Sequence, residues 1–354
     1  MIFVGGSPLF SSSSSSQGSE NLQALLEHPV LISATDSFKA IPERKISVPE
    51  GSGLEGSTQI KHVYIFQREY ATVDPALVEL VGTDEATTCV GLVIRNQKTG
   101  MTSVAHMDSP EIVDFGLAQM LSLVADPRLD AELDVHLIGG YEDTSCEVCP
   151  HCSGISVSDR HIEPEGYSFP LCSKIVEVLH KRQEIFHIQT LCILGHNTRR
   201  DSDGNTYPIF NGFVFLFTSQ VETSTGSVKP ATFDRSSRCP DEIVRRIRVT
   251  VSCGDPSWNG KLLETYDTHI DRFQIAPCSW VPYWRRHAFI LQKLSDPEIL
   301  LKCSTSPYAE GPDFVDNERR VFDYLIQHPN WKDTFPMRKP RIFHRSADGG
   351  WIKC

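Results

Sequence analysis

Residues 83–106 read TDEATTCVGLVIRNQKTGMTSVAH, and this stretch has the pattern of a β-hairpin. Two runs of β-type residues flank a polar turn that ends in Gly100, which is typical of antiparallel strands joined by a short loop. A turn centred between Gln97 and Lys98 places Cys89 opposite His106 on the neighbouring strand. Directly opposed side chains have Cβ atoms roughly 4.5–5.5 Å apart, so we expect the thiol and the imidazole to be neighbours.

A thiol beside an imidazole suits nucleophilic catalysis. The thiolate is the reactive form of cysteine, and a neighbouring histidine can take the thiol proton and hold the thiolate. The polar residues 83–85 and the hydroxyls of Thr87 and Thr88 lie directly before Cys89. Polar groups and backbone N–H donors at this position favour an oxyanion hole.

The same residues also have a purely structural interpretation. A cysteine in an apolar strand is commonly a small buried core residue, and a histidine near a turn is commonly a solvated surface residue. A register slip of one residue would turn His106 to the other face of the sheet and separate the pair. Spacing alone therefore leaves both interpretations open.

The composition argues against two classes of partner. The chain has 354 residues, of which 40% are hydrophobic, and its formal net charge is −11 with a pI near 5.6. Nucleic acids and anionic membranes bind basic faces, so neither is an expected partner. The acidic balance is compatible with a protonated amine as ligand, such as a protein N-terminus. No stretch approaches the roughly 20 apolar residues of a membrane span.

The beginning of the chain lacks the features of a secretory signal. Residues 1–6 have no basic region and no long apolar core. Residues 11–16 are all Ser, as in some transit peptides, but no Lys or Arg occurs before Lys39. Eleven cysteines in such a chain indicate reduced thiols. We therefore expect a cytoplasmic protein, with the nucleus as an additional compartment.

The order of strand-like and helix-like segments predicts the fold class. Residues 1–20, rich in Ser and Gly, predict a disordered N-terminus, and residues 21–354 predict a single catalytic domain. The predicted strands are 62–66, 77–81, 133–138, 185–194, 210–218, 249–252, 262–266 and 273–275, and the predicted helices are 21–27, 111–124, 173–182, 241–247 and 313–327. Strands outnumber helices, which interrupt them singly. This pattern predicts an α+β fold, an α/β layered sandwich with mixed, largely antiparallel sheets and flanking helices.

A collinear set of short segments resembles the protein N-terminal asparagine amidohydrolases. The resemblance runs from about residue 62 to residue 351, and its segments are GTDEATTC at 82–89, TSVAHMD at 102–108, LDVHLIGGY at 133–141, TLC at 190–192, APCSW at 276–280 and STSPYAE at 304–310. The Cys/His spacing is also similar to that of the bacterial chemoreceptor glutamine deamidases. Those enzymes carry a Thr a few residues before the cysteine, where this chain has Thr83.

The resemblance implies deamidation of an N-terminal asparagine to aspartate with release of ammonia. Cys89 would attack the carboxamide carbon, and His106 would hold the thiolate and then protonate the departing ammonia. Water would hydrolyse the thioester, and Thr83 would orient His106 or the substrate amide. The substrates would be proteins or peptides with a free N-terminal Asn, and no cofactor is implied. By resemblance the reaction is the first step of an N-degron route of protein degradation.

Specificity for a free N-terminus calls for a carboxylate near the thiol. The local carboxylates are Asp84, Glu85 and Asp108, and we expect Asp84 or Glu85 to bind the α-amine. We add Thr88, next to the thiol, to the substrate-binding candidates. Each carboxylate is alternatively explained as a solvated loop charge.

Residues 142–166 depart from the family pattern and are rich in cysteine. Cys146, Cys149 and Cys152, together with His161, form a partial zinc or iron–sulfur ligand set. A metal there would stabilise the insertion and would have no catalytic role. The alternative is a surface insertion whose thiols bind nothing.

Two other functions remain open. One is a thiol deamidase that acts on another amide, such as glutamine. The other is a metal-stapled protein-interaction module in which Cys89 belongs to the core.

Overall fold

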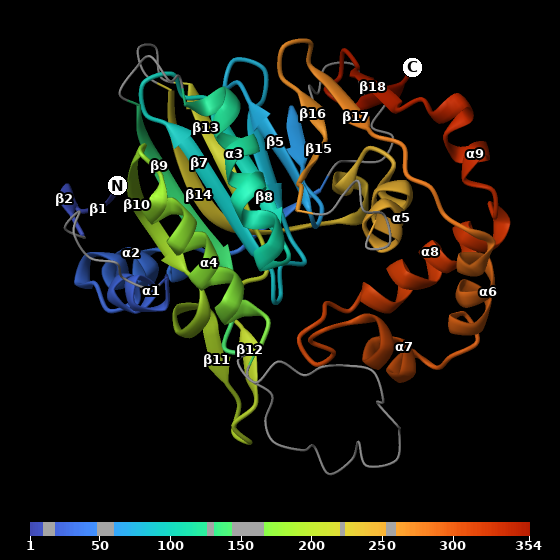
Figure 1. The fold of residues 1–354 in the computed structure, drawn as a ribbon, viewed down its shortest axis with the longest axis horizontal. Coiled ribbons are helices and arrows are strands. Elements are labelled where there is room, and N and C mark those ends of the chain that lie inside the picture. Colours follow the sequence, from blue (N-terminus) through green and yellow to red (C-terminus); the bar gives the residue numbers. More distant parts are fainter. Residues whose placement is uncertain (10–17, 48–59, 126–130, 144–165, 220–223, 253–259) are drawn as a thin grey trace.

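The computed structural model describes residues 1–9, 18–47, 60–125, 131–143, 166–219, 224–252 and 260–354. A sheet of eight strands lies between a layer of helices and a second sheet of five strands (Figure 1). Further helices and a small four-stranded sheet occupy the C-terminal side of the molecule. This arrangement confirms the predicted α+β layered sandwich.

The two main sheets contain most of the strands. The eight-stranded sheet has the order β15 (Leu263–Glu264), β5 (Glu69–Val73), β8 (Thr102–Met107), β7 (Val90–Asn96), β9 (Glu132–Gly139), β10 (Ile185–Cys192), β1 (Ile2–Val4) and β2 (Ser7–Pro8). The second sheet has the order β3 (Arg44–Ile46), β14 (Ser224–Phe233), β13 (Phe213–Ser219), β6 (Leu80–Thr83) and β4 (His62–Tyr64). The small sheet contains β16 (Tyr266–Asp267), β17 (Arg272–Ile275), β18 (Arg341–Arg345) and β19 (Trp351–Lys353), and β11 (Thr198–Arg200) and β12 (Thr206–Pro208) form a separate hairpin.

The helices cover one face of the large sheet and build the C-terminal part. They are α1 (Gly18–Leu26), α2 (Pro29–Lys39), α3 (Val113–Val124), α4 (Ser168–Lys181), α5 (Glu242–Ser252), α6 (Pro282–Leu291), α7 (Asp296–Cys303), α8 (Phe314–Gln327) and α9 (Trp331–Thr334). Helices α3 and α4 cross the outer face of the large sheet (Figure 1). Among the helices of the described residues, none combines the length and apolar character needed to cross a bilayer.

Strand β7 is central to this packing because it is buried on both faces. All seven of its residues are buried. Leu92 and Ile94 pack with the helical layer, whereas Val93 packs with Phe213 and Phe215 of the second sheet. A strand buried on both faces is expected to be apolar throughout, which explains the run of Val, Leu and Ile in the predicted hairpin.

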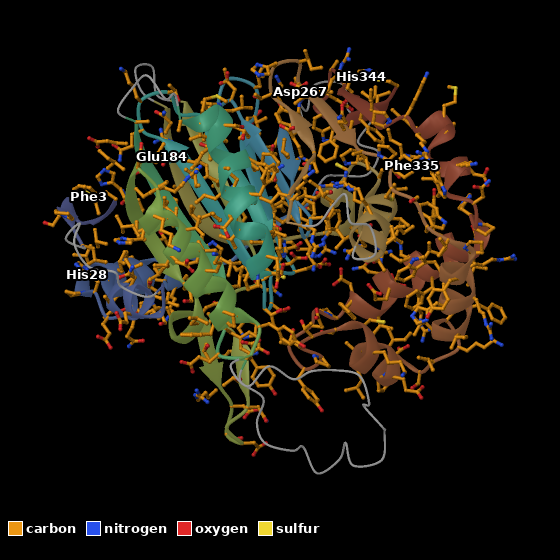
Figure 2. The ribbon with its side chains drawn as sticks, in the orientation of Figure 1. Phe3, His28, Glu184, Asp267, Phe335 and His344 are labelled. Atoms are coloured by element: carbon orange, nitrogen blue, oxygen red, sulfur yellow. The ribbon has the colours of Figure 1, made fainter. Side chains whose placement is uncertain are left out.

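The N-terminus is more ordered than the sequence predicted. The prediction of disorder is wrong for Ile2–Pro8, because β1 pairs in parallel with β10 and β2 folds back on β1. Ile2 and Val4 are buried, and the amine of Met1 donates to the carbonyl oxygen of Glu184 at 2.6 Å. Figure 2 labels Phe3 and Glu184 on this side of the sheet. Residues 10–17 lie outside the described part of the chain.

Two predictions of local structure are also corrected. The helix predicted at 21–27 is confirmed as α1, and a second helix that was not predicted, α2, begins at Pro29. Proline suits the first position of a helix, where its missing N–H has no helical partner. The strand predicted at 249–252 is wrong, because these residues continue α5.

A fully buried ion cluster joins α5 to the large sheet. The side chains of Glu69, Arg245 and Arg248 are 0% exposed, and both arginines donate to the Glu69 carboxylate. Glu69 also accepts from the backbone N–H of Phe66 at 2.9 Å and thereby closes the turn before β5. In this turn the N–H of Arg68 donates to the carbonyl oxygen of His106 at 2.8 Å. The cluster therefore supports the end of β8 that carries His106.

We expect the Glu69→Gln variant to lose about 3–5 kcal/mol of unfolding free energy, because it leaves two buried guanidinium groups without their counter-charge. Urea denaturation at pH 7 measures this change. Glu111→Gln, at an exposed position, is the matched control and should change stability by less than about 0.5 kcal/mol. Equal stabilities of the two variants would contradict a structural role for the cluster.

Candidate active site

The candidate site lies where the chain passes from one main sheet to the other. Strand β6 of the second sheet ends at Thr83, and residues 84–89 lead into β7 of the large sheet. Strand β8, which pairs with β7, carries His106 near its end. The crossing brings Thr83, Cys89 and His106 to the same end of the two sheets.

The register of the hairpin corrects the predicted pairing. His106 lies opposite Gly91, not opposite Cys89, because Arg95 pairs with Thr102 and the turn is centred one residue later than predicted. Moving the centre by one residue moves each partner by two, and side chains on a strand return to the same face every two residues. Cys89 lies directly before β7 and two residues before Gly91, so the same periodicity, continued to the residue before the strand, would keep it on the face that carries His106.

Gly91 allows the two sheets to approach closely at this point. A Cβ at Gly91 would lie 2.1 Å from Cε1 of Phe213, so no other residue fits without moving the ring. Phe213 is paired with Thr83 in the second sheet. The close approach thus brings Thr83 within reach of His106, on the other sheet.

One ring nitrogen of His106 is hydrogen-bonded, and the other has no hydrogen-bond partner among the described residues. Nδ1 lies 2.8 Å from Oγ1 of Thr83, and the two residues are 1% and 0% exposed. Either group can be the donor in this contact; if the Thr83 hydroxyl donates to the carbonyl oxygen of Asp84, 3.4 Å away, Nδ1–H of the imidazole donates to Oγ1. Nε2 then carries the lone pair, and this buried atom has no hydrogen-bond partner within the described residues. Burial lowers the pKa of His106 to about 4, so the ring is neutral near pH 7.

The thiol of Cys89 is also neutral at rest. Its residue is 9% exposed. Burial raises the pKa of the thiol well above its ordinary value, and the charges of Asp108 and Glu310 raise it further, while the Thr88 hydroxyl acts in the opposite direction. A neutral thiol and a neutral imidazole on one sheet face can react only if the proton moves as sulfur attacks.

Asp84 has a structural role in residues 84–89, the crossing segment that connects the two main sheets. Its carboxylate accepts from the Tyr64 hydroxyl at 2.6 Å, the Phe233 N–H at 2.7 Å and the Arg238 guanidinium at 3.0 Å. Burial, followed by the charge of Glu85, raises the pKa of Asp84 to about 6, and Arg238 opposes both effects. These three bonds tie the crossing segment to β4, to β14 and to Arg238 in the turn that follows β14.

The other predicted carboxylates also have arginine partners. Glu85 lies 2.7 Å from Arg238 and 2.9 Å from Arg246. Asp108 accepts from Arg68 at 3.1 Å. The structure therefore places Glu85 and Asp108, like Asp84, in ion pairs that already neutralise them.

Thr88 lies where the crossing segment contacts the loop between α7 and α8, which is distant in sequence. Its hydroxyl is 3.1 Å from the hydroxyl of Thr305. One residue earlier, the Thr87 hydroxyl accepts from Ser306 at 3.0 Å. The loop between α7 and α8 is thus hydrogen-bonded to the two residues before Cys89.

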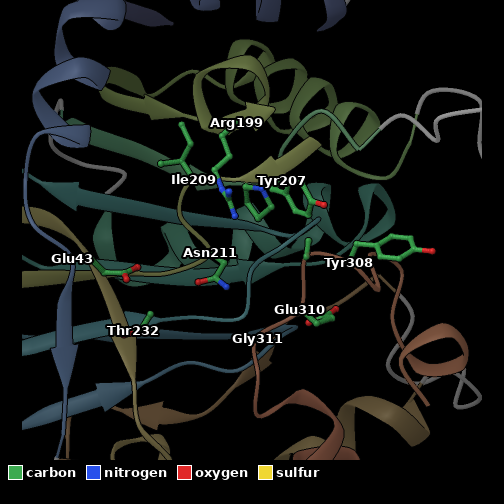
Figure 3. Close-up of a pocket in the computed structure, with 11 residues that line it drawn as sticks. Glu43, Arg199, Tyr207, Ile209, Asn211, Thr232, Tyr308, Glu310 and Gly311 are labelled. Atoms are coloured by element: carbon green, nitrogen blue, oxygen red, sulfur yellow. The ribbon is translucent and has the colours of Figure 1, made fainter. Parts of the chain in front are cut away.

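Glu310, in the same loop, belongs to the site and was given no role by the sequence analysis. It lines a cavity of 310 Å³, shown in Figure 3, whose other lining residues are Glu43, Arg199, Tyr207, Pro208, Ile209, Asn211, Thr232, Tyr308, Ala309 and Gly311. Burial raises the pKa of Glu310 to about 7, while the Ser304 hydroxyl, which donates to it, has a lowering effect. The segment STSPYAE at 304–310 was the available signal, but nothing local connects it to Cys89.

The glycine pair at 139–140 packs against the thiol segment. Gly139 has a φ of +111°, and a Cβ there would lie 2.6 Å from the carbonyl oxygen of Cys89. Glycine is needed for this backbone conformation and for this approach. The segment LDVHLIGGY therefore ends against the turn that carries the nucleophile candidate.

The predicted metal ligands Cys146, Cys149, Cys152 and His161 lie outside the described residues. Within the described ranges, no group of three or more His, Cys, Asp or Glu side chains could hold a metal ion.

A thiol segment, an imidazole in contact with a threonine and a layered α+β fold are compatible with a hydrolase that acts on an amide. A family model described as protein N-terminal asparagine amidohydrolase matches residues 52–353. The chain therefore belongs to this family, as the sequence resemblance predicted.

Relatives from plants and mammals carry the same name. The chain is 59% identical over 360 residues to protein N-terminal asparagine amidohydrolase of Arabidopsis thaliana, and the match covers 100% of both chains. It is 28% identical over 327 residues to the protein of that name from Sus scrofa, covering 90% of this chain and 93% of the relative. The Homo sapiens protein is 27% identical over 328 residues, covering 91% and 94%.

We expect Cys89 to react with iodoacetamide slowly at pH 6–7 and progressively faster as the pH rises above 8, because burial keeps the thiol protonated at neutral pH. Peptide mapping by mass spectrometry gives the rate at Cys89, with the exposed Cys354 as internal reference. A rate that stays constant and fast below pH 7 would instead indicate a preformed thiolate–imidazolium pair.

Proposed function

We propose that this protein deamidates an N-terminal asparagine of proteins or peptides to aspartate and releases ammonia. The observation that carries the proposal is the buried Nε2 of His106, which has no hydrogen-bond partner among the described residues, in a ring whose Nδ1 contacts the Thr83 hydroxyl. Membership of the amidohydrolase family supports the choice of reaction.

The first half-reaction forms a thioester. The thiol proton of Cys89 moves to Nε2 of His106 as sulfur attacks the carboxamide carbon of the substrate. The resulting tetrahedral oxyanion is stabilised by backbone N–H groups of the segment before Cys89. The imidazolium then gives its proton to the amide nitrogen, because this nitrogen leaves as ammonia only when protonated.

The second half-reaction restores the enzyme. A water molecule gives a proton to Nε2 of His106 while its oxygen attacks the thioester carbon. The carbon–sulfur bond breaks, the thiolate takes the proton back, and the substrate leaves with Asp in place of Asn. Thr83 keeps Nδ1–H hydrogen-bonded throughout, so Nε2 always faces the reacting atoms.

In this proposal Thr88 lines the substrate site, while the three predicted carboxylates act mainly on its surroundings. Asp84, Glu85 and Asp108 already bind arginines, so a role for them in binding the substrate amine would require an ion pair to open. Glutamine, one methylene longer, would place its amide away from the thiol. Pocket size alone gives only about 1–3 kcal/mol of discrimination, and misplacement of the amide must supply the rest.

We also propose that the aspartate product enters an N-degron route of protein degradation, in the cytoplasm and nucleus. The support for this step is the family resemblance, and the substrates are proteins or peptides with a free N-terminal Asn.

We expect purified protein to release ammonia from a peptide that begins with Asn, with a mass gain of about 1 Da as NH₂ is replaced by OH. Cys89→Ala should lower kcat at least about 10⁴-fold because the nucleophile is lost. Ammonia release and mass spectrometry measure both effects. Cys354→Ala is the matched control and should retain full activity, since this thiol is exposed and belongs to the C-terminal sheet region.

Three further peptides separate the competing functions. The N-acetylated Asn peptide and a Gln peptide should not be turned over. Turnover of the Gln peptide at the rate of the Asn peptide would favour a broader thiol deamidase, and an unchanged rate in Cys89→Ala would exclude Cys89 as the nucleophile.

We expect Thr83→Val to lower kcat about 10²-fold with little change in KM, because Nδ1–H loses its acceptor and the ring loses its fixed orientation. Thr83→Ser retains the hydroxyl and should remain within about fivefold of the wild type. Steady-state kinetics on the Asn peptide provide the comparison. Equal losses in the two variants would point to packing of the Thr83 methyl group, not to the hydrogen bond.

A further inference from the structure

We infer that the carboxylate of Glu310 binds the α-ammonium group of the substrate, at the cavity that Glu310 and Asn211 line. This inference rests on the proposed function and identifies the group that would select a free N-terminus. It assigns a binding role to a residue that is far from Cys89 in sequence.

The loop that carries Glu310 has a fixed position relative to the thiol segment. Thr305 and Ser306 contact the hydroxyls of Thr88 and Thr87 at 3.1 and 3.0 Å. Within the loop, the N–H of Ser306 donates to the Ser304 hydroxyl at 2.9 Å. Ser304 in turn donates to one oxygen of Glu310. This chain of hydrogen bonds holds the carboxylate in relation to Cys89.

Glu310 also lies within electrostatic reach of the reacting atoms. Its charge acts on the thiol of Cys89 and on the hydroxyl of Tyr141, which follows the glycine pair packed against Cys89. The cavity that Glu310 lines adjoins the same segment, because Asn211 lines it and accepts from the N–H of Ala86 at 2.8 Å. An N-terminal asparagine has its ammonium only three bonds from the carboxamide carbon, so one small site must hold both groups.

Glu310 differs from the other carboxylates near Cys89 in making no ion pair among the described residues, although the charge of Arg246 acts on it in the direction that lowers its pKa. Asp84, Glu85 and Asp108 each bind at least one arginine within 3.1 Å. In the part of the chain that the structure describes, Glu310 makes no ion pair, and its side-chain partner is the Ser304 hydroxyl. A partly buried carboxylate that lacks a counter-ion and faces a cavity is a ready site for an ammonium ligand.

The protonation of Glu310 makes the site sensitive to pH. Burial raises the pKa of its carboxyl to about 7. The carboxyl is therefore largely neutral below pH 7 and ionised above it, whereas a peptide α-amine stays protonated up to about pH 8. The ion pair is available between these two values, and substrate affinity should fall as the pH decreases below 7.

The test compares two peptides that differ only at the amine. One begins with Asn, and the other begins with a succinamoyl group, which keeps the reacting carboxamide but replaces the α-amine with hydrogen. We expect wild-type kcat/KM to favour the Asn peptide strongly. In Glu310→Gln the KM for the Asn peptide should rise about 10- to 100-fold, and the preference over the succinamoyl peptide should fall by the same factor. A purely structural role of Glu310 would lower both rates together and leave the preference unchanged.

Glu43→Gln is the matched control, because Glu43 lines the same cavity and Figure 3 shows it on the other side of Asn211 from Glu310. It should keep the wild-type preference for the free amine. A loss of preference in Glu43→Gln equal to that in Glu310→Gln would overturn the assignment to Glu310.

A second measurement uses only the wild-type protein and is independent of how the variants fold. KM for the Asn peptide should rise about tenfold per pH unit below pH 7, while KM for the succinamoyl peptide stays constant. Parallel pH profiles for the two peptides would overturn the inference while leaving the proposed function intact. Absence of ammonia release from the Asn peptide at any pH would overturn the proposed function itself.

Discussion

The hydrogen bond between Thr83 and His106 is the contact on which the candidate site depends, because it joins the two main sheets. Thr83 belongs to the second sheet and His106 to the large one, so their distance of 2.8 Å requires close packing of the sheets. Gly91 makes this packing possible by leaving room for the ring of Phe213. With the Thr83 hydroxyl directed to the carbonyl oxygen of Asp84, Nδ1 carries the ring proton and Nε2 the lone pair. One inter-sheet contact thus sets the position of the base.

The charges around Cys89 are arranged so that most of them cancel. Arginines neutralise Asp84, Glu85 and Asp108, and these ion pairs hold the crossing segment and the end of β8 in place. Burial, with the charges of Asp108 and Glu310, raises the pKa of the thiol, and burial lowers the pKa of the imidazole, so both groups are uncharged at rest. Glu310 is the exception among the carboxylates near Cys89. Its carboxylate lines the cavity without an ion-pair partner among the described residues, and a cationic ligand would neutralise it.

The sequence predicted the members of the site better than their contacts. The hairpin pattern of residues 83–106 selected Cys89 and His106 as candidates, and resemblance to the deamidases added Thr83, which the structure places against His106. The turn is displaced by one residue, which keeps paired positions on their faces because strand periodicity is two. The prediction that Asp84 or Glu85 binds the α-amine had weaker support. Asp84 and Glu85 are adjacent to the thiol segment in sequence, but Arg238 and Arg246, which bind them, come from a distant part of the chain. No local pattern could have revealed these partners.

By itself the sequence determined what depends on local periodicity and composition: the alternation of strands and helices, the hairpin and the residue types of the candidate site. The tertiary structure alone decided the features that depend on contacts between distant segments. Strand β14 reads STGSVKPATF, without the apolar run of a typical strand, and it exists because β13 pairs along its whole length. The placement of the loop 304–310 over Thr87 and Thr88 is of the same kind. Such contacts stabilise the fold only when the chain has brought both segments together. They therefore cannot be predicted from the sequence of either segment alone.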